Sequence, residues 1–375
     1  MKKVSSYGDP AQYVTHLHVT EECMDNPYAK EIIERASLPV IILKDGNLPD
    51  VPGIFPENLT QGKHHLLLCK HRGVFFKPCP GTREYTCCGY QVLNIGMNCP
   101  MDCVYCILQA YLNNPWLSFC VNIEDMFAEL DNVLLHQPEQ FYRIGTGEFT
   151  DSLAIDSLTE LSPRLIRYMN NKSNAVLELK TKCNIIKQLE HVPHNGRTVV
   201  GWSLNSPIIM AKEELRTATL DQRLEAAAQV AEWGYHLAFH FDPIIYHDNW
   251  QQGYRETIRR LFEAVPADKI AWISMGALRY LPSLKNIATD RFPRSTFFYE
   301  EFINGLDNKY RYFRPQRVSM YQFILGELKK YAAERTCIYF CMESSEIWQE
   351  VFGYTPEEHG GLPKMLDRTV SVTGH

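Results

Sequence analysis

The sequence predicts an α/β fold: a partial (β/α)6 barrel between an N-terminal α+β extension and a C-terminal cap. Three observations lead to this prediction. Apolar, β-branched segments recur through residues 89–276, helix-like stretches separate most of them, and 375 residues suit one barrel with terminal extensions. Six strands are too few for a closed eight-fold barrel, so we expect an open barrel with its chemistry at the C-terminal strand ends.

The expected strands are short and rich in branched apolar and aromatic residues. They cover residues 91–95, 142–145, 175–179, 198–203, 237–241 and 270–274. Asn122 can cap a helix that runs to about residue 136. Apolar spacing of three to four residues predicts a second helix over 221–233, which ends at Gly234.

The two flanks differ from the barrel in composition. Residues 1–88 alternate short apolar runs, such as 39–43 and 65–68, with Pro and Gly, which indicates a small α+β extension. The barrel is expected over residues 89–290. Residues 291–375 are richer in aromatic and basic side chains, which favours a cap that contacts substrate or nucleic acid.

Composition limits the functional class. Hydrophobic residues make up 45% of the chain and charged residues 22%, which suits a globular protein with a sizeable core. The formal net charge of −6 disfavours non-specific DNA binding, so any nucleic-acid surface must be a local patch. No secretory signal and no apolar run near ~20 residues is evident, so we expect a cytoplasmic protein with no membrane partner. Twelve cysteines there indicate metal ligands, catalysis or packing rather than disulfides.

The strongest chemical signal is Cys99-Pro-Met-Asp-Cys103-Val-Tyr-Cys106, directly after the first expected strand. Cubane iron–sulfur clusters are held by cysteine thiolates, so one such loop can bind three irons and leave the fourth open to a ligand. Structural zinc normally takes four ligands, and no fourth Cys or His follows at finger spacing. Packing alone explains three cysteines in eight residues poorly. The spacing predicts a [4Fe–4S] cluster on Cys99, Cys103 and Cys106.

This loop resembles that of the radical S-adenosylmethionine (SAM) superfamily, including the aromatic Tyr105 before the last cysteine. The resemblance implies that the cluster cleaves SAM to a 5′-deoxyadenosyl radical. Gly145-Thr-Gly147-Glu148 resembles the Gly-Gly-Glu strand end that holds the SAM amino group in such enzymes, and a carboxylate suits an ammonium. A Glu in a solvated loop is the alternative interpretation of Glu148.

Further motifs narrow the resemblance to the spore photoproduct lyase family, over about residues 91–283. They are Cys103-Val-Tyr-Cys106-Ile-Leu-Gln109, Thr181-Lys182, Trp202-Ser203-Leu-Asn205, Leu220-Asp-Gln-Arg223-Leu-Glu225 with Gly234-Tyr235 after it, and Pro243-Ile-Ile-Tyr-His247-Asp-Asn-Trp250-Gln-Gln-Gly253-Tyr254. The resemblance implies a DNA repair lyase: the radical abstracts hydrogen from a 5-thyminyl-5,6-dihydrothymine lesion, the lesion splits, and a cysteine returns a hydrogen atom.

The same resemblance implies cofactors, partners and site residues. The cofactors are the [4Fe–4S] cluster and SAM. The partners are a reductase or flavodoxin/ferredoxin-type electron donor and a DNA or nucleotide substrate. Tyr105 and Glu148 are the expected catalytic residues. The SAM contacts are expected from Tyr105, Glu148, Thr150, Asp151, Lys182 and Ser203.

Two departures from the family pattern lie where substrate radicals are handled. Glu148 occupies the position of the hydrogen-donor cysteine, and a carboxylate cannot donate a hydrogen atom as a thiol can. Ile107 replaces the tyrosine that follows the last cluster cysteine in the lyase. Another cysteine, such as Cys183 or Cys341, could substitute for the donor.

Three other features have two interpretations each. Cys79, Cys87 and Cys88, with Cys337 and Cys341, could bind a second metal or be buried hydrophobes. The polar pair in His240-Phe-Asp242 could bind substrate or form a hydrogen-bonded barrel layer. The basic and aromatic run over residues 309–317 could contact nucleic acid or be a solvated charged face.

Three hypotheses for function follow. The first is a lyase of the spore photoproduct type that acts on a thymine-derived base. The second is a divergent radical SAM enzyme that modifies another nucleobase, a metabolite or a peptide, in which Glu148 and Ile107 mark the divergence. The third is a non-catalytic metal- or nucleic-acid-binding protein, which predicts a colourless, zinc-containing preparation.

Overall fold

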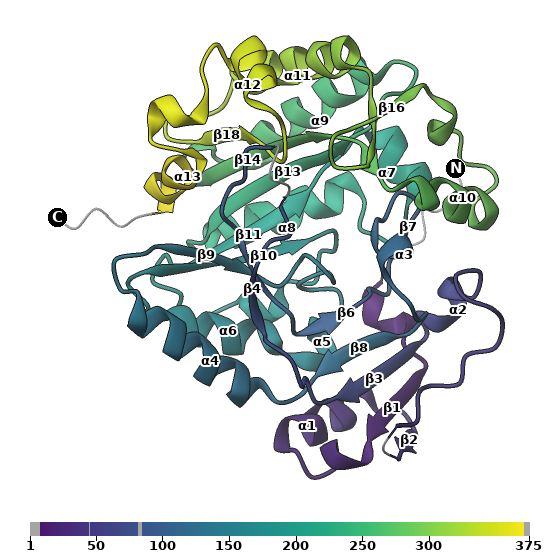
Figure 1. The fold of residues 1–375 in the computed structure, drawn as a ribbon. Coiled ribbons are helices and arrows are strands. Elements are labelled where there is room, and N and C mark those ends of the chain that lie inside the picture. The colour runs from purple at the N-terminus through teal and green to yellow at the C-terminus, as the bar shows by residue number, and fades with distance from the viewer. Residues whose placement is uncertain (1–7, 45, 82–84, 371–375) are drawn as a thin grey trace.

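A curled sheet of eight strands forms the core of the computed structural model, which describes residues 8–44, 46–81 and 85–370 (Figure 1). Its strand order is β18-β14-β13-β11-β10-β9-β5-β4. The strands are β4 (Phe76–Pro78), β5 (Gln91–Leu93), β9 (Tyr142–Gly145), β10 (Ala175–Thr181), β11 (Thr198–Ser203), β13 (His236–Ile244), β14 (Ile270–Ala277) and β18 (Cys337–Phe340).

All six predicted strands are present, neighbouring and parallel, which confirms the partial barrel. Two strands that the sequence did not reveal extend it. β4 pairs antiparallel with β5 at one edge, and β18 pairs parallel with β14 at the other. β4 contains Lys77 and Pro78 and therefore lacks an apolar run, and β18 lies in the segment expected to form the cap. They come from the expected extension and cap, and the division of the chain at residues 88 and 290 stays a prediction.

The predicted helices lie between the strands. α4 (Ile123–His136) follows Asn122, whose amide binds Asp125 instead of a helix N–H. α8 (Leu220–Glu232) begins with a capping box formed by Thr219 and Gln222, and Gly234 after it has a φ of 89°. α6 (Leu161–Met169) lies between β9 and β10 in the chain, and α9 (Trp250–Ala264) lies between β13 and β14.

A second sheet lies below the barrel in Figure 1 and contains the N-terminal segment. Its order is β2-β1-β3-β8-β6, with helix α1 (Pro27–Ala36) packed beside it. The apolar runs at 39–43 and 65–68 contain two of its strands, within the segment expected to be an α+β extension. The sheet is largely parallel, however, and takes β8 and β6 from beyond residue 88. The strands are β1 (His16–Thr20), β2 (Val40–Leu43), β3 (His65–Cys69), β6 (Gly96–Met97) and β8 (Leu117–Cys120).

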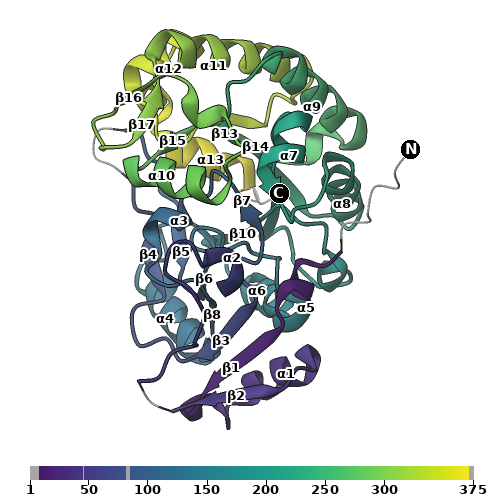
Figure 2. The same ribbon diagram turned by 90° about the vertical axis from the view of Figure 1, so that its right-hand side faces the viewer.

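C-terminal elements cover the other side of the barrel (Figure 2). They are α10 (Pro282–Arg291), the small sheet of β15 (Arg279–Tyr280), β16 (Phe302–Asn304) and β17 (Tyr310–Tyr312), and the helices α11 (Arg314–Leu328), α12 (Ser345–Phe352) and α13 (Leu362–Val370). No helix in the described ranges is long and apolar enough to span a membrane.

The two edges of the open barrel meet at a seam. The N–H of Thr86, before β5, donates to the carbonyl of Glu343, after β18, at 3.0 Å. Arg143 on β9 donates to the Cys88 carbonyl and forms an ion pair with Asp367 on α13. The seam therefore joins segments from opposite ends of the chain.

Candidate active site

A cavity of about 160 Å³ opens where the barrel strands end. Its walls are the cysteine loop, the segment after β9 and the ends of β10 and β11. All the predicted site residues except Tyr105 line it, together with Lys180, Thr181 and Ile107: Cys99, Cys103, Cys106, Glu148, Thr150, Asp151, Lys182 and Ser203. Tertiary structure thus brings residues up to 104 positions apart in sequence into one site.

The three thiols suit a cluster better than a single ion. No three His, Cys, Asp or Glu side chains in residues 8–44, 46–81 and 85–370 are arranged to hold one metal ion. A cubane distributes three thiolates over three irons. Burial raises the pKa of the Cys99 and Cys103 thiols, and Lys63 and Lys182 respectively oppose this rise. The free thiols and their shared cavity fit a [4Fe–4S] cluster.

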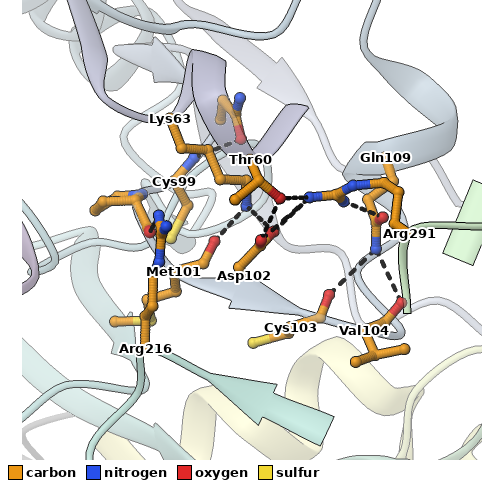
Figure 3. A network of polar contacts seen from close by, with 12 residues as sticks. Thr60, Lys63, Cys99, Met101, Asp102, Cys103, Val104, Gln109, Arg216 and Arg291 are labelled. Atoms are coloured by element: carbon orange, nitrogen blue, oxygen red, sulfur yellow. Dashed lines mark hydrogen bonds and ion pairs between the residues drawn. The ribbon is translucent and has the colours of Figure 1, made fainter. Parts of the chain in front are cut away.

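Asp102 anchors the cysteine loop from within (Figure 3). Its carboxylate accepts from Thr60 of α2 (Leu59–Gly62) at 2.8 Å and from Arg291 of α10 at 2.9 Å, and Lys63 lies 3.2 Å away. Burial alone would raise the pKa of Asp102, but Lys63 and Arg291 lower it to about 2. The loop is therefore held by a buried charged network from both flanks of the barrel.

Two amides complete this support. Gln109, on α3 (Leu108–Tyr111), donates to the carbonyls of Cys103 and Val104 at 3.2 and 2.9 Å and accepts from Arg291. Asn98 has a φ of 68° and donates through its side chain to the Pro115 carbonyl at 2.9 Å. Sequence analysis missed these supports. The available signal was the density of polar residues within and beside an otherwise apolar loop.

Asp151 ties the segment after β9 to the end of β10. Its carboxylate accepts from the Thr181 hydroxyl at 2.7 Å and from the N–H groups of Lys182 and Leu153 at 2.8 and 3.0 Å. Burial raises the pKa of Asp151, and these hydrogen bonds oppose the rise. Asp151 thereby holds Lys182 at the cavity wall.

Tyr105 lies behind the cavity wall. Its hydroxyl donates to Glu214 on β12 (Glu214–Leu215), and Arg223 donates to the same carboxylate at 2.6 Å. The Lys182 ammonium lies 5.9 Å from the centre of the Tyr105 ring. The aromatic ring therefore supports Lys182, and a catalytic role for Tyr105 stays a prediction.

Glu148 and Lys180 are charged side chains of the cavity without a hydrogen bond or ion pair to the part of the chain that the structure describes. Both line the cavity with the cysteines. Removing a charge from bulk water costs free energy unless another group pairs with it, and a bound ligand can supply that group. These two side chains are therefore available to bind polar groups of a ligand.

His240 and Asp242 on β13 had two interpretations, substrate binding or a hydrogen-bonded barrel layer. His240 contacts Glu178 at 2.8 Å and Ser274 at 2.7 Å inside the barrel, as a hydrogen-bonded layer. Asp242 accepts from Arg279 through both oxygens, at 3.1 and 3.2 Å. Asp242 lies in the group of charges near Lys180, and Lys180 also helps burial to lower the pKa of His240.

The basic run over 309–317 is not a free basic face. Lys309, Arg311 and Arg317 are buried, and Asp307 and Glu343 neutralise them. Arg314 is exposed but pairs with Glu350 at 2.7 Å. Sequence alone could not show these carboxylate partners.

Four of the additional cysteines gather near the seam. Cys79 and Cys88 each lie close enough to Cys341 for its charge to affect their pKa values, and Cys87 contacts Cys88. Cys337 lies at the other end of β18, where burial raises its pKa to about 12. A second metal on these cysteines stays a prediction.

An open β/α barrel with three free thiols after its first strand, beside strand-end polar groups, defines the radical SAM class of enzyme. The cofactors of that class are a [4Fe–4S] cluster and SAM. Comparison with known proteins then gives the family: the chain belongs to the spore photoproduct lyase family, whose model matches residues 48–340.

Named relatives agree with this assignment. Spore photoproduct lyase from Bacillus subtilis is 29% identical over 54% of this chain and 60% of that protein. The enzyme from Geobacillus is 26% identical over 76% and 84%, and that from Clostridium acetobutylicum is 22% identical over 85% and 96%.

Solved structures share the fold. A mutant spore photoproduct lyase with bound AdoMet and dinucleoside spore photoproduct has a TM-score of 0.78, at 22% identity over 87% of this chain and 98% of that chain. Spore photoproduct lyase complexed with dinucleoside spore photoproduct has a TM-score of 0.77, at 22% identity over 88% and 99%.

Proposed function

We propose that this protein is a DNA repair lyase that acts on a thymine lesion of the spore photoproduct type. The observation that carries the proposal is the cavity in which three cluster thiols face Glu148, Lys180, Lys182 and Ser203. Membership of the spore photoproduct lyase family supports the choice of substrate. When bound, the cluster and SAM supply a 5′-deoxyadenosyl radical that abstracts hydrogen from the substrate.

The residues of the cavity have separable roles in this proposal. Cys99, Cys103 and Cys106 hold the cluster. Glu148, which lacks a protein partner among the described residues, accepts hydrogen bonds from the SAM ammonium. Lys182, positioned by Asp151 and supported by Tyr105, neutralises the SAM carboxylate.

The proposed reaction also requires access to the lesion and a source of electrons. In duplex DNA the lesion must leave the stack before its hydrogen can be reached, at a cost of a few kcal/mol. A flavodoxin- or ferredoxin-type donor supplies the electron. We place the enzyme in the cytoplasm, where thiols stay reduced.

The test is release of 5′-deoxyadenosine by the anaerobically reconstituted protein with SAM and a strong reductant, with and without spore-photoproduct DNA. We expect release that the lesion stimulates, together with thymine formation. Release that ignores the lesion would favour the divergent radical SAM enzyme. No release from protein with a full cluster would refute the proposal, and a colourless zinc protein would favour the non-catalytic alternative.

A substitution tests the role of Glu148. Glu148→Gln should raise the KM for SAM about tenfold or more, because a charge-assisted hydrogen bond is lost, and should leave the iron content unchanged. The matched control is Glu139→Gln, which changes an exposed glutamate outside the cavity. An unchanged KM for SAM in Glu148→Gln would assign Glu148 to another role.

A further inference from the structure

The proposed reaction requires a hydrogen donor that the sequence pattern leaves unassigned. This inference rests on the proposed function. A 5-thyminyl-5,6-dihydrothymine lesion and two thymines are isomers, so a hydrogen atom removed from the lesion must be replaced in the product. The Glu148 carboxylate cannot supply a hydrogen atom, whereas the S–H bond of a thiol is weak enough to do so.

Few thiols have access to the cavity. Cys183 is fully buried, and its sulfur lies 3.1 Å from the Thr181 hydroxyl. Cys23, Cys69 and Cys120 lie at the N-terminal sheet, and Cys337 lies at the start of β18. This leaves the cysteines at the barrel seam.

Cys341 is the seam thiol that the surrounding structure positions. It directly follows β18, at the C-terminal end of the barrel strands, where the chemistry of such barrels takes place. The Arg279 guanidinium donates to its sulfur at 3.4 Å, and Arg279 is itself fixed by two hydrogen bonds to Asp242. The side chain is therefore held in one place while remaining partly exposed.

The thiol lies near charged groups of the cavity wall, although it is not itself one of the lining residues. Asp242, Lys180 and Glu148 all lie close enough to act on its protonation, in addition to Arg279. Lys180 and Glu148 line the cavity with the cluster cysteines. With Glu148 assigned to the SAM ammonium, a substrate that binds Lys180 would lie between the SAM site and Cys341.

The thiol also carries the hydrogen that the step needs. Burial raises the pKa of Cys341 to about 11, although Arg279 and Lys180 act to lower it. The side chain is therefore a protonated thiol near neutral pH and not a thiolate.

We propose that Cys341 donates the hydrogen atom that quenches the product radical after the lesion has split. The C–H bond of the thymine methyl group forms, the S–H bond of Cys341 breaks, and a thiyl radical remains on the sulfur. One electron from the flavodoxin- or ferredoxin-type donor, or from the chemical reductant in an assay, and one proton from solvent restore the thiol. Lys180 is a positioning residue for the substrate in this step.

The test compares Cys341→Ser with Cys337→Ser in reconstituted enzyme, with dinucleoside spore photoproduct, SAM and reductant in D2O. The serine variant keeps size and polarity but offers an O–H bond too strong to donate a hydrogen atom. Wild type and Cys337→Ser should incorporate one solvent deuterium per repaired lesion. Cys341→Ser should still form 5′-deoxyadenosine within about twofold of wild type. The ratio of 5′-deoxyadenosine to repaired thymine should rise at least tenfold.

A second measurement does not depend on turnover. With oxidised cluster and no reductant, the dinucleoside should slow N-ethylmaleimide labelling of Cys341, read by mass spectrometry, several-fold more than that of Cys87. Equal labelling with and without the dinucleoside would overturn the assignment. So would an unchanged product ratio in Cys341→Ser, or a raised ratio in Cys79→Ser alone. Wild-type enzyme that releases 5′-deoxyadenosine without consuming lesion would overturn the proposed function and this inference together.

Discussion

Asp102→Asn tests whether the buried charge network holds the cluster loop. The substitution removes the negative charge but keeps the size of the side chain. It leaves Lys63, at 3.2 Å, and Arg291, at 2.9 Å, without their common counter-charge. All three side chains are only 4–5% exposed, so water cannot replace the carboxylate.

The expected effect is large. Removing one partner of a buried ion pair costs roughly 3–5 kcal/mol. An unfolding entropy of about 2.1 cal/mol/K per residue gives about 0.8 kcal/mol/K for 375 residues. The midpoint of thermal unfolding should therefore fall by about 4–6 °C. Because Asp102 lies between two cluster cysteines, iron should also be lost faster to a chelator.

The assay is anaerobic thermal unfolding of the reconstituted protein, followed by circular dichroism, with iron release measured in parallel. Asp25→Asn is the matched control. It breaks an ion pair of similar length, 3.2 Å to Lys30, between side chains that are 59% and 103% exposed. Surface pairs contribute about 0–1 kcal/mol, so this midpoint should move by no more than about 1 °C. Equal midpoints and equal iron release in the two variants would refute the reasoning.

Three further predictions concern other parts of the molecule. Glu214→Gln leaves the fully buried Arg223 unpaired and should lower stability by roughly 3–5 kcal/mol, measured by urea denaturation; a loss under 1 kcal/mol would contradict this. Cys106→Ser should abolish cluster assembly, seen as loss of iron and sulfide, with the far-ultraviolet circular dichroism unchanged; full iron content would exclude Cys106 as a ligand. Burial, and after it the charge of His16, lowers the pKa of His65 from 6.5 to about 4. The contribution of neutral His65 to folding stability is therefore fully present above pH 6.5 and is lost as the pH falls toward 4. His65→Gln should therefore reduce the stability lost between pH 7 and 4 by up to about 3 kcal/mol, and an unchanged pH profile would show that other groups control it.

Sequence by itself determined the barrel strands and the chemical class. The six strands could be predicted because each is a short apolar run and helical segments separate most of them, which is a local property of the chain. The cluster loop could be predicted because its three cysteines lie within eight residues and no ligand residue from a distant part of the sequence is needed. Glu148, Lys182 and Ser203 were predicted from the resemblance to radical SAM enzymes and the spore photoproduct lyase family. The structure brings them together in one cavity, where the ends of parallel barrel strands converge.

Only tertiary structure decided what surrounds that loop and which charges are free. The Asp102 network joins Lys63 and Arg291 across 228 residues of sequence, and no local pattern encodes such a pairing. The basic run at 309–317 looked like a binding surface until its distant carboxylate partners were placed beside it. Cys341 lies beside Arg279 and near Glu148 because β18 pairs with β14 and forms one edge of the curled sheet. Each of these depends on contacts between segments far apart in the chain, which packing determines and local sequence does not.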